Sequence, residues 1–101
     1  MAPSAIPLTT LGSEVTTFAV SSNVVKITGN AGANVVETIT GGVSGQELTI
    51  IFPDGLVTIT DTNDGAANTV DLASTLVSAD DTVLKLIFDG TVWREVSRSV
   101  N

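Results

Sequence analysis

The abundance of β-branched residues constrains this chain most, because valine, isoleucine and threonine together make up 36 of its 101 residues. These side chains lose rotamer freedom in a helix, whereas they pack well on the pleated surface of a sheet. No segment shows apolar residues at the i, i+3, i+4 and i+7 spacing of an amphipathic helix without an interruption by glycine or a β-branched residue. The sequence therefore predicts an all-β fold, with at most one helical turn near residues 71–76.

Short apolar segments alternate with turn-forming residues at a spacing of about 8–12 residues, which is typical of a small β-domain. Asp54-Gly55 and Asp89-Gly90 are strong hairpin signals, because a tight turn needs a positive φ that glycine accepts. We expect an extended N-terminal arm over residues 1–12. A single domain over residues 13–101 follows, a small β-solenoid or β-sandwich-like domain of short antiparallel strands. The predicted strands are Val15–Val20, Val24–Thr28, Val35–Thr40, Glu47–Phe52, Leu56–Thr60, Thr69–Leu72, Thr82–Phe88 and Val92–Ser97.

An internal repeat supports this architecture. The segment Leu48–Gly55 returns as Leu84–Gly90, and each copy is a strand that runs into an Asp-Gly turn. Alternation along a strand places the first, third and fifth residues of each copy on the core face, and the fourth residues, Ile51 and Ile87, on the opposite face. Apolar residues on both faces predict burial on both faces. We expect a neighbouring subunit to cover the second face, and the alternative is another strand layer of the same chain.

The composition excludes several classes of function. Cysteine and histidine are absent, which removes disulfides, thiolate nucleophiles, zinc ribbons and Ser-His-Asp catalysis together. The net charge is −7 with only four basic residues, and this opposes binding to nucleic acid and to anionic lipid. No apolar run approaches the ~20 residues of a membrane span. We therefore expect no cofactor, no metal, no nucleic acid and no membrane among its partners, and oligomerisation as the source of additional stability.

Four motifs suggest chemistry, but a structural role is favoured for each. Asp61–Gly65 resembles a calcium loop, yet threonines occupy the first two ligand positions, so an Asx-rich turn is preferred. The adjacent Asp80 and Asp81 are expected to face solvent at the start of a strand instead of forming a catalytic pair. Gly41–Gly45 has the glycines of a phosphate loop without its lysine. The single tryptophan, Trp93, is expected to pack at a hairpin or a subunit contact. The sequence thus predicts that the protein is not an enzyme.

The N-terminal arm differs from the rest of the chain. Pro3 and Pro7 fix φ and remove two backbone donors, which keeps the segment extended. Ile6, Leu8 and Leu11 interrupt an otherwise polar stretch. We expect these five residues to dock on a partner, and the alternative is a frayed terminus.

Two parts of the sequence resemble a known group of proteins. Gly45–Phe52 with the following Asp54-Gly55, and Asp80–Thr91 with the following Trp93–Ser99, are similar to the small β-domain at the tips and C-terminal ends of bacteriophage tail fibres and tailspikes. The closing DGT-x-W-x-E-x-SRS pattern is the most specific part, and the resemblance spans about residues 41–101. It implies a homotrimer with interlocking β-strands and without an active site of its own, of a kind that also occurs on other virion surface proteins.

The leading interpretation is a bacteriophage virion structural protein, a homotrimeric capsid decoration or cement protein whose arm binds the phage major capsid protein. Tail fibres are long, whereas only the arm precedes the β-domain after Met1, and this favours the capsid. The alternative is a receptor-binding tip or trimerisation module of a tail fibre or tailspike, with tail fibre proteins as partners.

A depolymerase fragment is the least favoured interpretation. In the two favoured ones the protein is made in the host cytoplasm and resides in the virion, on the capsid surface or the tail. The predicted subunit interface consists of Ile51, Ile87, Val92, Trp93 and Val96.

Overall fold

A computed structural model describes residues 8–12, 15–29, 34–62 and 65–99 of the chain. These residues form strands and no helix, which confirms the all-β prediction. None of them belongs to a helix long and apolar enough to cross a membrane. The strands are β1 (Leu8–Thr10), β2 (Thr17–Ala19), β3 (Val24–Thr28), β4 (Asn34–Val36), β5 (Thr38–Thr40), β6 (Glu47–Phe52), β7 (Val57–Ile59), β8 (Val70–Asp71), β9 (Leu76–Val77), β10 (Thr82–Phe88) and β11 (Trp93–Ser99).

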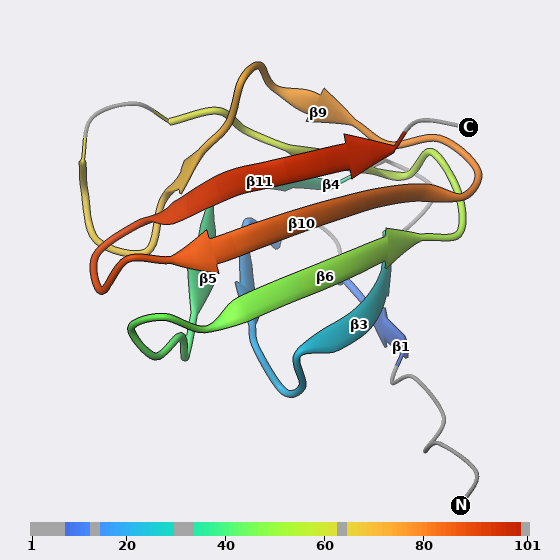
Figure 1. Ribbon diagram of the computed structural model, residues 1–101. Coiled ribbons are helices and arrows are strands. Elements are labelled where there is room, and N and C mark those ends of the chain that lie inside the picture. Colours follow the sequence, from blue (N-terminus) through green and yellow to red (C-terminus); the bar gives the residue numbers. More distant parts are fainter. Residues whose placement is uncertain (1–7, 13–14, 30–33, 63–64, 100–101) are drawn as a thin grey trace, which may run out of the picture.

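A six-stranded sheet forms one layer of the fold, in the order β1-β3-β6-β10-β11-β8. Its central part is an antiparallel meander, in which β10 pairs with β6 on one side and with β11 on the other. Figure 1 shows β6, β10 and β11 across the front of the molecule, with β4 and β5 behind them. The second layer consists of the β2-β5 pair and the three-stranded sheet β4-β7-β9. The result is a sandwich-like domain.

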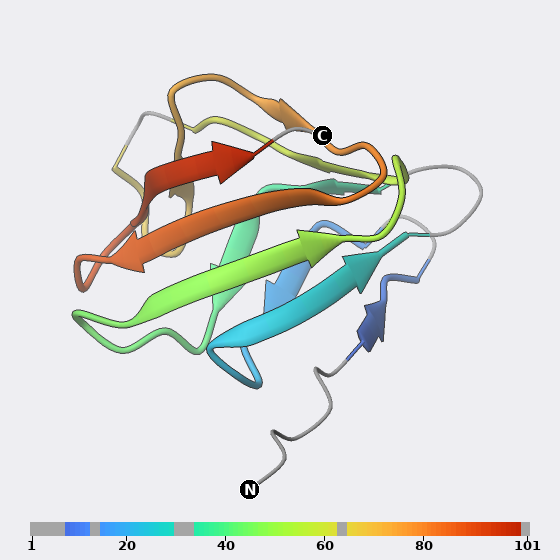
Figure 2. The same cartoon turned by 45° about the vertical axis from the view of Figure 1, so that its right-hand side comes forward.

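The N-terminal half winds like a solenoid, and its strands pair in parallel. β3 lies between β1 and β6 in the same direction as both, β2 pairs with β5, and β4 pairs with β7. Figure 2 shows β1, β3 and β6 side by side in one sheet. The prediction of antiparallel strands is therefore confirmed for the β6-β10-β11 meander and the β7-β9 pair. It is wrong for the N-terminal half, where the strands pair in parallel. Residues alternate between the two faces of a strand whichever way its neighbour runs, so the sequence pattern did not distinguish the two arrangements.

The buried face of the large sheet carries the residues that the repeat predicts. The first, third and fifth residues of both copies are buried. The two copies lie antiparallel to each other, with Leu48 opposite Leu86 and Ile50 opposite Leu84. Phe18 of β2 belongs to the same hydrophobic core from the second layer. Among the described residues, no charged side chain is buried in this core, so apolar packing holds the two layers together.

Candidate functional site

The outward face of the six-stranded sheet presents apolar side chains to solvent. Strand pairing places Ile51 of β6 between Lys26 of β3 and Val83 of β10, and Leu8 of β1 lies next to Lys26. Ile87, further along β10, is 37% exposed and Leu8 is 59% exposed. No other strand lies in front of this face in Figures 1 and 2. We call the part of this face that β1, β3, β6 and β10 form the outer sheet face. It consists of Leu8, Thr10, Val24, Lys26, Thr28, Glu47, Thr49, Ile51, Val83, Lys85 and Ile87.

The outer sheet face is close to electrically neutral, although the chain as a whole carries a charge of −7. Its one acidic residue, Glu47, is ion-paired with Lys85, and 3.1 Å separates Oε1 from Nζ. Lys26 adds a single positive charge. On the adjacent strand β11, Arg94 lies 3.1 Å from Asp71 and 2.9 Å from Asp89. The excess of negative charge therefore lies outside this face.

The residues predicted at a subunit interface divide into two groups. Ile51 is half-buried and Ile87 exposed on the outer sheet face, while Val96 is 52% exposed at a β-bulge of β11. Val92 and Trp93 are corrected to core positions, because only 5% and 0% of these residues is exposed. Trp93 has no exposed surface, and Val92 has very little, with which to contact a neighbouring subunit. A contact between subunits through the other three residues stays a prediction.

Trp93 is held in the interior by polar and apolar contacts. Its indole Nε1–H donates a hydrogen bond to the carbonyl oxygen of Ile39 at 3.0 Å, and its ring centroid lies 4.8 Å from that of Phe88. Gly42 lies so close that a Cβ atom there would meet Cζ2 of the indole at 2.6 Å. The indole and its acceptor are 54 positions apart. No local pattern in the sequence could therefore have shown that this tryptophan belongs to the core.

The residues predicted to form a docking arm also divide. Pro3, Ile6 and Pro7 lie outside the described residues, and nothing in the structure bears on their role. Leu8 begins β1, which pairs with β3. Leu11 is only 4% exposed and lies in the hydrophobic core. Leu11 is therefore corrected from a docking residue to a core residue, whereas a partner contact through the exposed Leu8 stays a prediction.

The acidic motif at the β10–β11 turn has a structural role. Asp89 Oδ1 accepts hydrogen bonds from the backbone N–H groups of Val92 and Thr91, both at 2.9 Å. These two bonds, with the side-chain bond from Arg94, lower the pKa of Asp89 from 3.8 to about 2. Asp61, from the calcium-like motif, accepts the backbone N–H of Leu72 at 2.9 Å. Within the described part of the chain, no group of three or more acidic residues is placed to hold a metal ion.

A second charged cluster ties β11 to the loop between β8 and β9. Arg98 donates two hydrogen bonds to the Glu95 carboxylate at 2.7 and 2.8 Å, and one to the carbonyl oxygen of Ser74 at 2.7 Å. Glu95 also accepts the backbone N–H of Ala73 at 2.9 Å. The Arg98 hydrogen bond lowers the pKa of Glu95 below its ordinary value of 4.5. Both charged groups have hydrogen-bond partners within the chain. The cluster therefore has a structural role.

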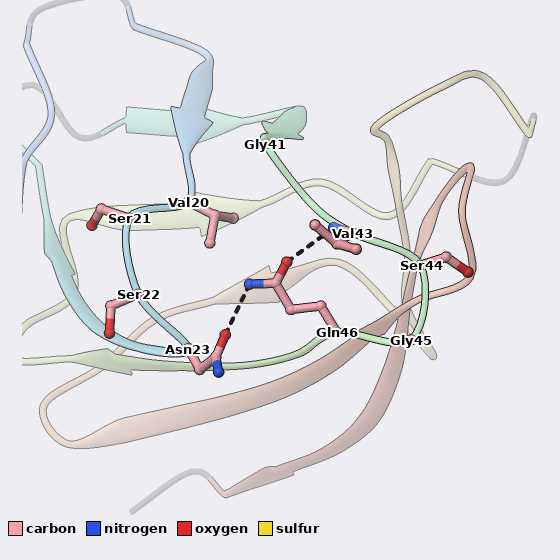
Figure 3. A pocket seen from close by; sticks show the side chains of 9 residues that line it. All are labelled: Val20, Ser21, Ser22, Asn23, Gly41, Val43, Ser44, Gly45 and Gln46. Atoms are coloured by element: carbon pink, nitrogen blue, oxygen red, sulfur yellow. Dashed lines mark hydrogen bonds between the residues drawn. The ribbon is translucent and has the colours of Figure 1, made fainter.

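A cleft of about 540 Å³ opens between the turn that joins β2 to β3 and the turn that joins β5 to β6. Figure 3 shows the Gln46 side chain reaching from one turn to the other. Its Nε2 donates a hydrogen bond to Asn23 Oδ1 at 2.9 Å, and its Oε1 accepts the backbone N–H of Val43 at 3.0 Å. The glycine-rich motif is thus a bend that forms one wall. The lining residues are Val20, Ser21, Ser22, Asn23, Gly41, Val43, Ser44, Gly45 and Gln46.

The comparison with protein families gives one match. A family model described as the phage depolymerase C-terminal beta sandwich domain matches residues 9–94. The chain belongs to this family. The match confirms the resemblance to the β-domains of tail fibres and tailspikes, and it also covers residues 9–40, which the resemblance left out. No curated protein and no solved structure matches the chain.

Membership of the depolymerase C-terminal domain family favours one of the two interpretations of the sequence. The family is associated with phage tails, and its domain is the non-catalytic, structural C-terminal part of phage depolymerases. The tail interpretation therefore fits better than the leading one. Capsid decoration, which was the leading interpretation, has no support from this match.

Proposed function

We propose that this protein is a structural module of a phage tail fibre or tailspike, in which copies of the chain associate as a homotrimer through the outer sheet face. One observation carries the proposal: a partly apolar and nearly neutral sheet face lies on a chain that is otherwise strongly acidic. Family membership supports the tail location. The number of three subunits rests on the resemblance to trimeric tail-fibre domains.

The apolar side chains of the outer sheet face supply the driving force. Ile51, Val83 and Ile87 are only partly covered by their own chain, and burying apolar surface contributes roughly 25 cal/mol per Å². Association also loses translational and rotational freedom, which costs about 4 kcal/mol or more. No single side chain offsets that cost, so the contact needs most of the face. The shape of a sheet suits this requirement, because its outward residues lie in regular rows.

Electrostatics favours this face over the rest of the surface. Two copies of a chain with a charge of −7 repel each other, and the repulsion is strongest where unpaired acids face one another. On the outer sheet face Glu47 is already neutralised by Lys85, and Lys26 leaves a small positive excess. Copies can therefore approach here without bringing like negative charges together. We assign no catalytic step to the chain itself.

The test measures the oligomeric state of the full chain by native mass spectrometry and analytical ultracentrifugation. We expect a trimer for the wild type and dissociation for Ile87→Glu, which places a negative charge within the contact, next to Glu47. The matched control is Val77→Glu, because Val77 is 65% exposed on β9 in the second layer. A monomeric wild type would refute the proposal. Equal effects of the two substitutions would show that the contact does not lie on the outer sheet face.

A further inference from the structure

Lys26 is a positive charge to which the described residues of its own chain offer no counter-ion. The other three of the four basic residues each form an ion pair, whereas Lys26 forms none with the described residues. It is exposed on β3, where strand pairing places it between Leu8 and Ile51 of the outer sheet face. A contact through this face encloses the charge, and an enclosed charge without an opposite partner is strongly destabilising. The neighbouring copy must therefore supply a carboxylate.

A carboxylate with a free oxygen lies at the far edge of the same sheet. The one acidic residue of the outer sheet face, Glu47, is already bonded to Lys85. Asp71 of β8 lies beyond it, separated from β3 by β6, β10 and β11, and Figure 1 shows β3 and β11 on opposite sides of β6 and β10. At about 4.8 Å per strand the two edges are roughly 19 Å apart. Lys26 therefore cannot reach Asp71 of its own copy.

Asp71, Asp89 and Arg94 form a cluster at this edge, which we call the Asp71 cluster. Arg94 bonds to Oδ2 of Asp71 at 3.1 Å and to Oδ2 of Asp89 at 2.9 Å, so two carboxylates share one guanidinium and one negative charge is left over. The Oδ1 atom of Asp71 accepts no hydrogen bond from the described residues. Because Arg94 lies opposite Ile87 in the β10–β11 pair, the cluster adjoins the outer sheet face.

The Asp71 cluster also lines a cleft that can receive a long side chain. The cleft has a volume of about 310 Å³, and Thr62 adds a hydroxyl to its wall. The Asp71 side chain is 28% exposed, so an ion pair formed there is less screened by solvent and salt than one on the open surface. The other lining residues are Gly65, Val92 and Arg94.

We propose that Lys26 of one copy enters the cleft of the next copy and forms an ion pair with Asp71 there. This inference rests on the proposed assembly function and names the charged contact that orients the subunits. The positive charge lies at one edge of the sheet and the surplus negative charge at the other, so each copy presents both halves of the contact. Charge pairs of this kind set the register of an interface and disfavour other orientations.

The first test is carbodiimide coupling, which joins a lysine amine to a carboxylate with loss of water and without a spacer. Unlabelled and ¹⁵N-labelled full chains are mixed until subunits exchange, coupled, digested and analysed by mass spectrometry. We expect Lys26 of one isotope to be joined to Asp71 of the other. The Lys85–Glu47 pair, 3.1 Å apart within one copy, is the internal control. If Lys26 of an intact assembly couples only to other acids, or to none, the inference is wrong.

The second test is a double-mutant cycle on the concentration at which half of the assembly dissociates. Lys26→Gln and Asp71→Asn should each raise this concentration about fivefold, because each leaves one charge enclosed without its partner. The double variant should be no weaker than either single one, since both charges are then gone. The matched control is Asp80→Asn, an exposed acid in the turn before β10, which should have no effect. Additive effects of Lys26→Gln and Asp71→Asn would overturn the inference.

The same measurements separate this inference from the proposed function. A wild type that stays monomeric refutes the assembly through the outer sheet face, and the ion pair with it. A trimer that Ile87→Glu dissociates, but in which the cycle is additive, keeps the proposed function and removes only the Lys26–Asp71 contact. Circular dichroism of each variant checks that the fold is retained, since Asp71→Asn also weakens the bond to Arg94.

Discussion

The contact between Gly42 and Trp93 gives the most quantitative test of the core. A Cβ atom at residue 42 would lie 2.6 Å from Cζ2 of the indole and 3.0 Å from Phe88, both too close for an unstrained fit. Overpacking of this kind costs about 1–3 kcal/mol. Replacing glycine by alanine also removes freedom from the unfolded chain, which returns about 0.4–1 kcal/mol. Gly42→Ala should therefore lower the free energy of unfolding by about 1–2 kcal/mol.

Trp93→Phe perturbs the same contact from the other side. The indole N–H is lost, which leaves the carbonyl oxygen of Ile39 without this donor in the interior, and the smaller ring leaves a void. An unsatisfied buried acceptor costs about 1–3 kcal/mol, and loss of packing adds roughly 1 kcal/mol. We expect the free energy of unfolding to fall by about 2–4 kcal/mol. Phenylalanine has no Cζ2 atom in the indole position, so it also removes the atom that a Cβ at residue 42 would strike.

The double variant distinguishes this explanation from a general weakening. If the clash is with the indole, Gly42→Ala should cost about 1 kcal/mol less when Trp93 is already phenylalanine. The free energies are measured by urea unfolding followed by circular dichroism, because Trp93 is the only tryptophan and its fluorescence is lost. All four proteins are compared at one protein concentration, since self-association also stabilises the fold. Additivity within about 0.5 kcal/mol would refute the proposed contact.

Two further predictions concern charged groups. The folded-state pKa of Asp89 is about 2, below its ordinary 3.8, so its ionised form stabilises the fold above pH ~4 and this contribution is lost as the pH falls towards 2. Thermal unfolding across that window should depend less on pH in Asp89→Asn, and an unchanged dependence would contradict the assignment. Glu95→Gln weakens the bonds from Arg98 and Ala73, and should lower the free energy of unfolding by about 1–2 kcal/mol. Urea unfolding checks this, with the exposed Glu37→Gln as control, and equal effects would contradict it.

The sequence predicted well what depends on alternation along one strand. Leu48, Ile50 and Phe52 are buried as expected, and so are the matching residues of the second copy. The pattern has a period of two residues and is read within a single segment, so it is insensitive to which strand lies alongside. The same property explains the error in strand direction. Parallel pairing of β3 with β6 depends on the path of the chain between them.

The functional residues were harder to predict because they depend on contacts between distant segments. Trp93 lies next to an Asp-Gly turn, which suggested packing at a hairpin or a subunit contact, yet its indole N–H bonds to Ile39 in the interior. Leu11 follows two prolines in a polar stretch, and only the tertiary structure shows that it is a core residue. The Gln46–Asn23 bond joins two turns that are far apart in sequence. Polar residues in turns are common, so no sequence signal marked these two for the cleft.

Strand β6 joins the parallel and the antiparallel parts of the large sheet. On one edge it continues the parallel winding through β3, and on the other it starts the antiparallel meander through β10. A slip of β6 by one residue would turn Leu48, Ile50 and Phe52 to the solvent side. It would break both pairings at once, because β3 and β10 pair with the two opposite edges of this strand. Correct pairing in both parts of the large sheet therefore depends on the register of one six-residue strand.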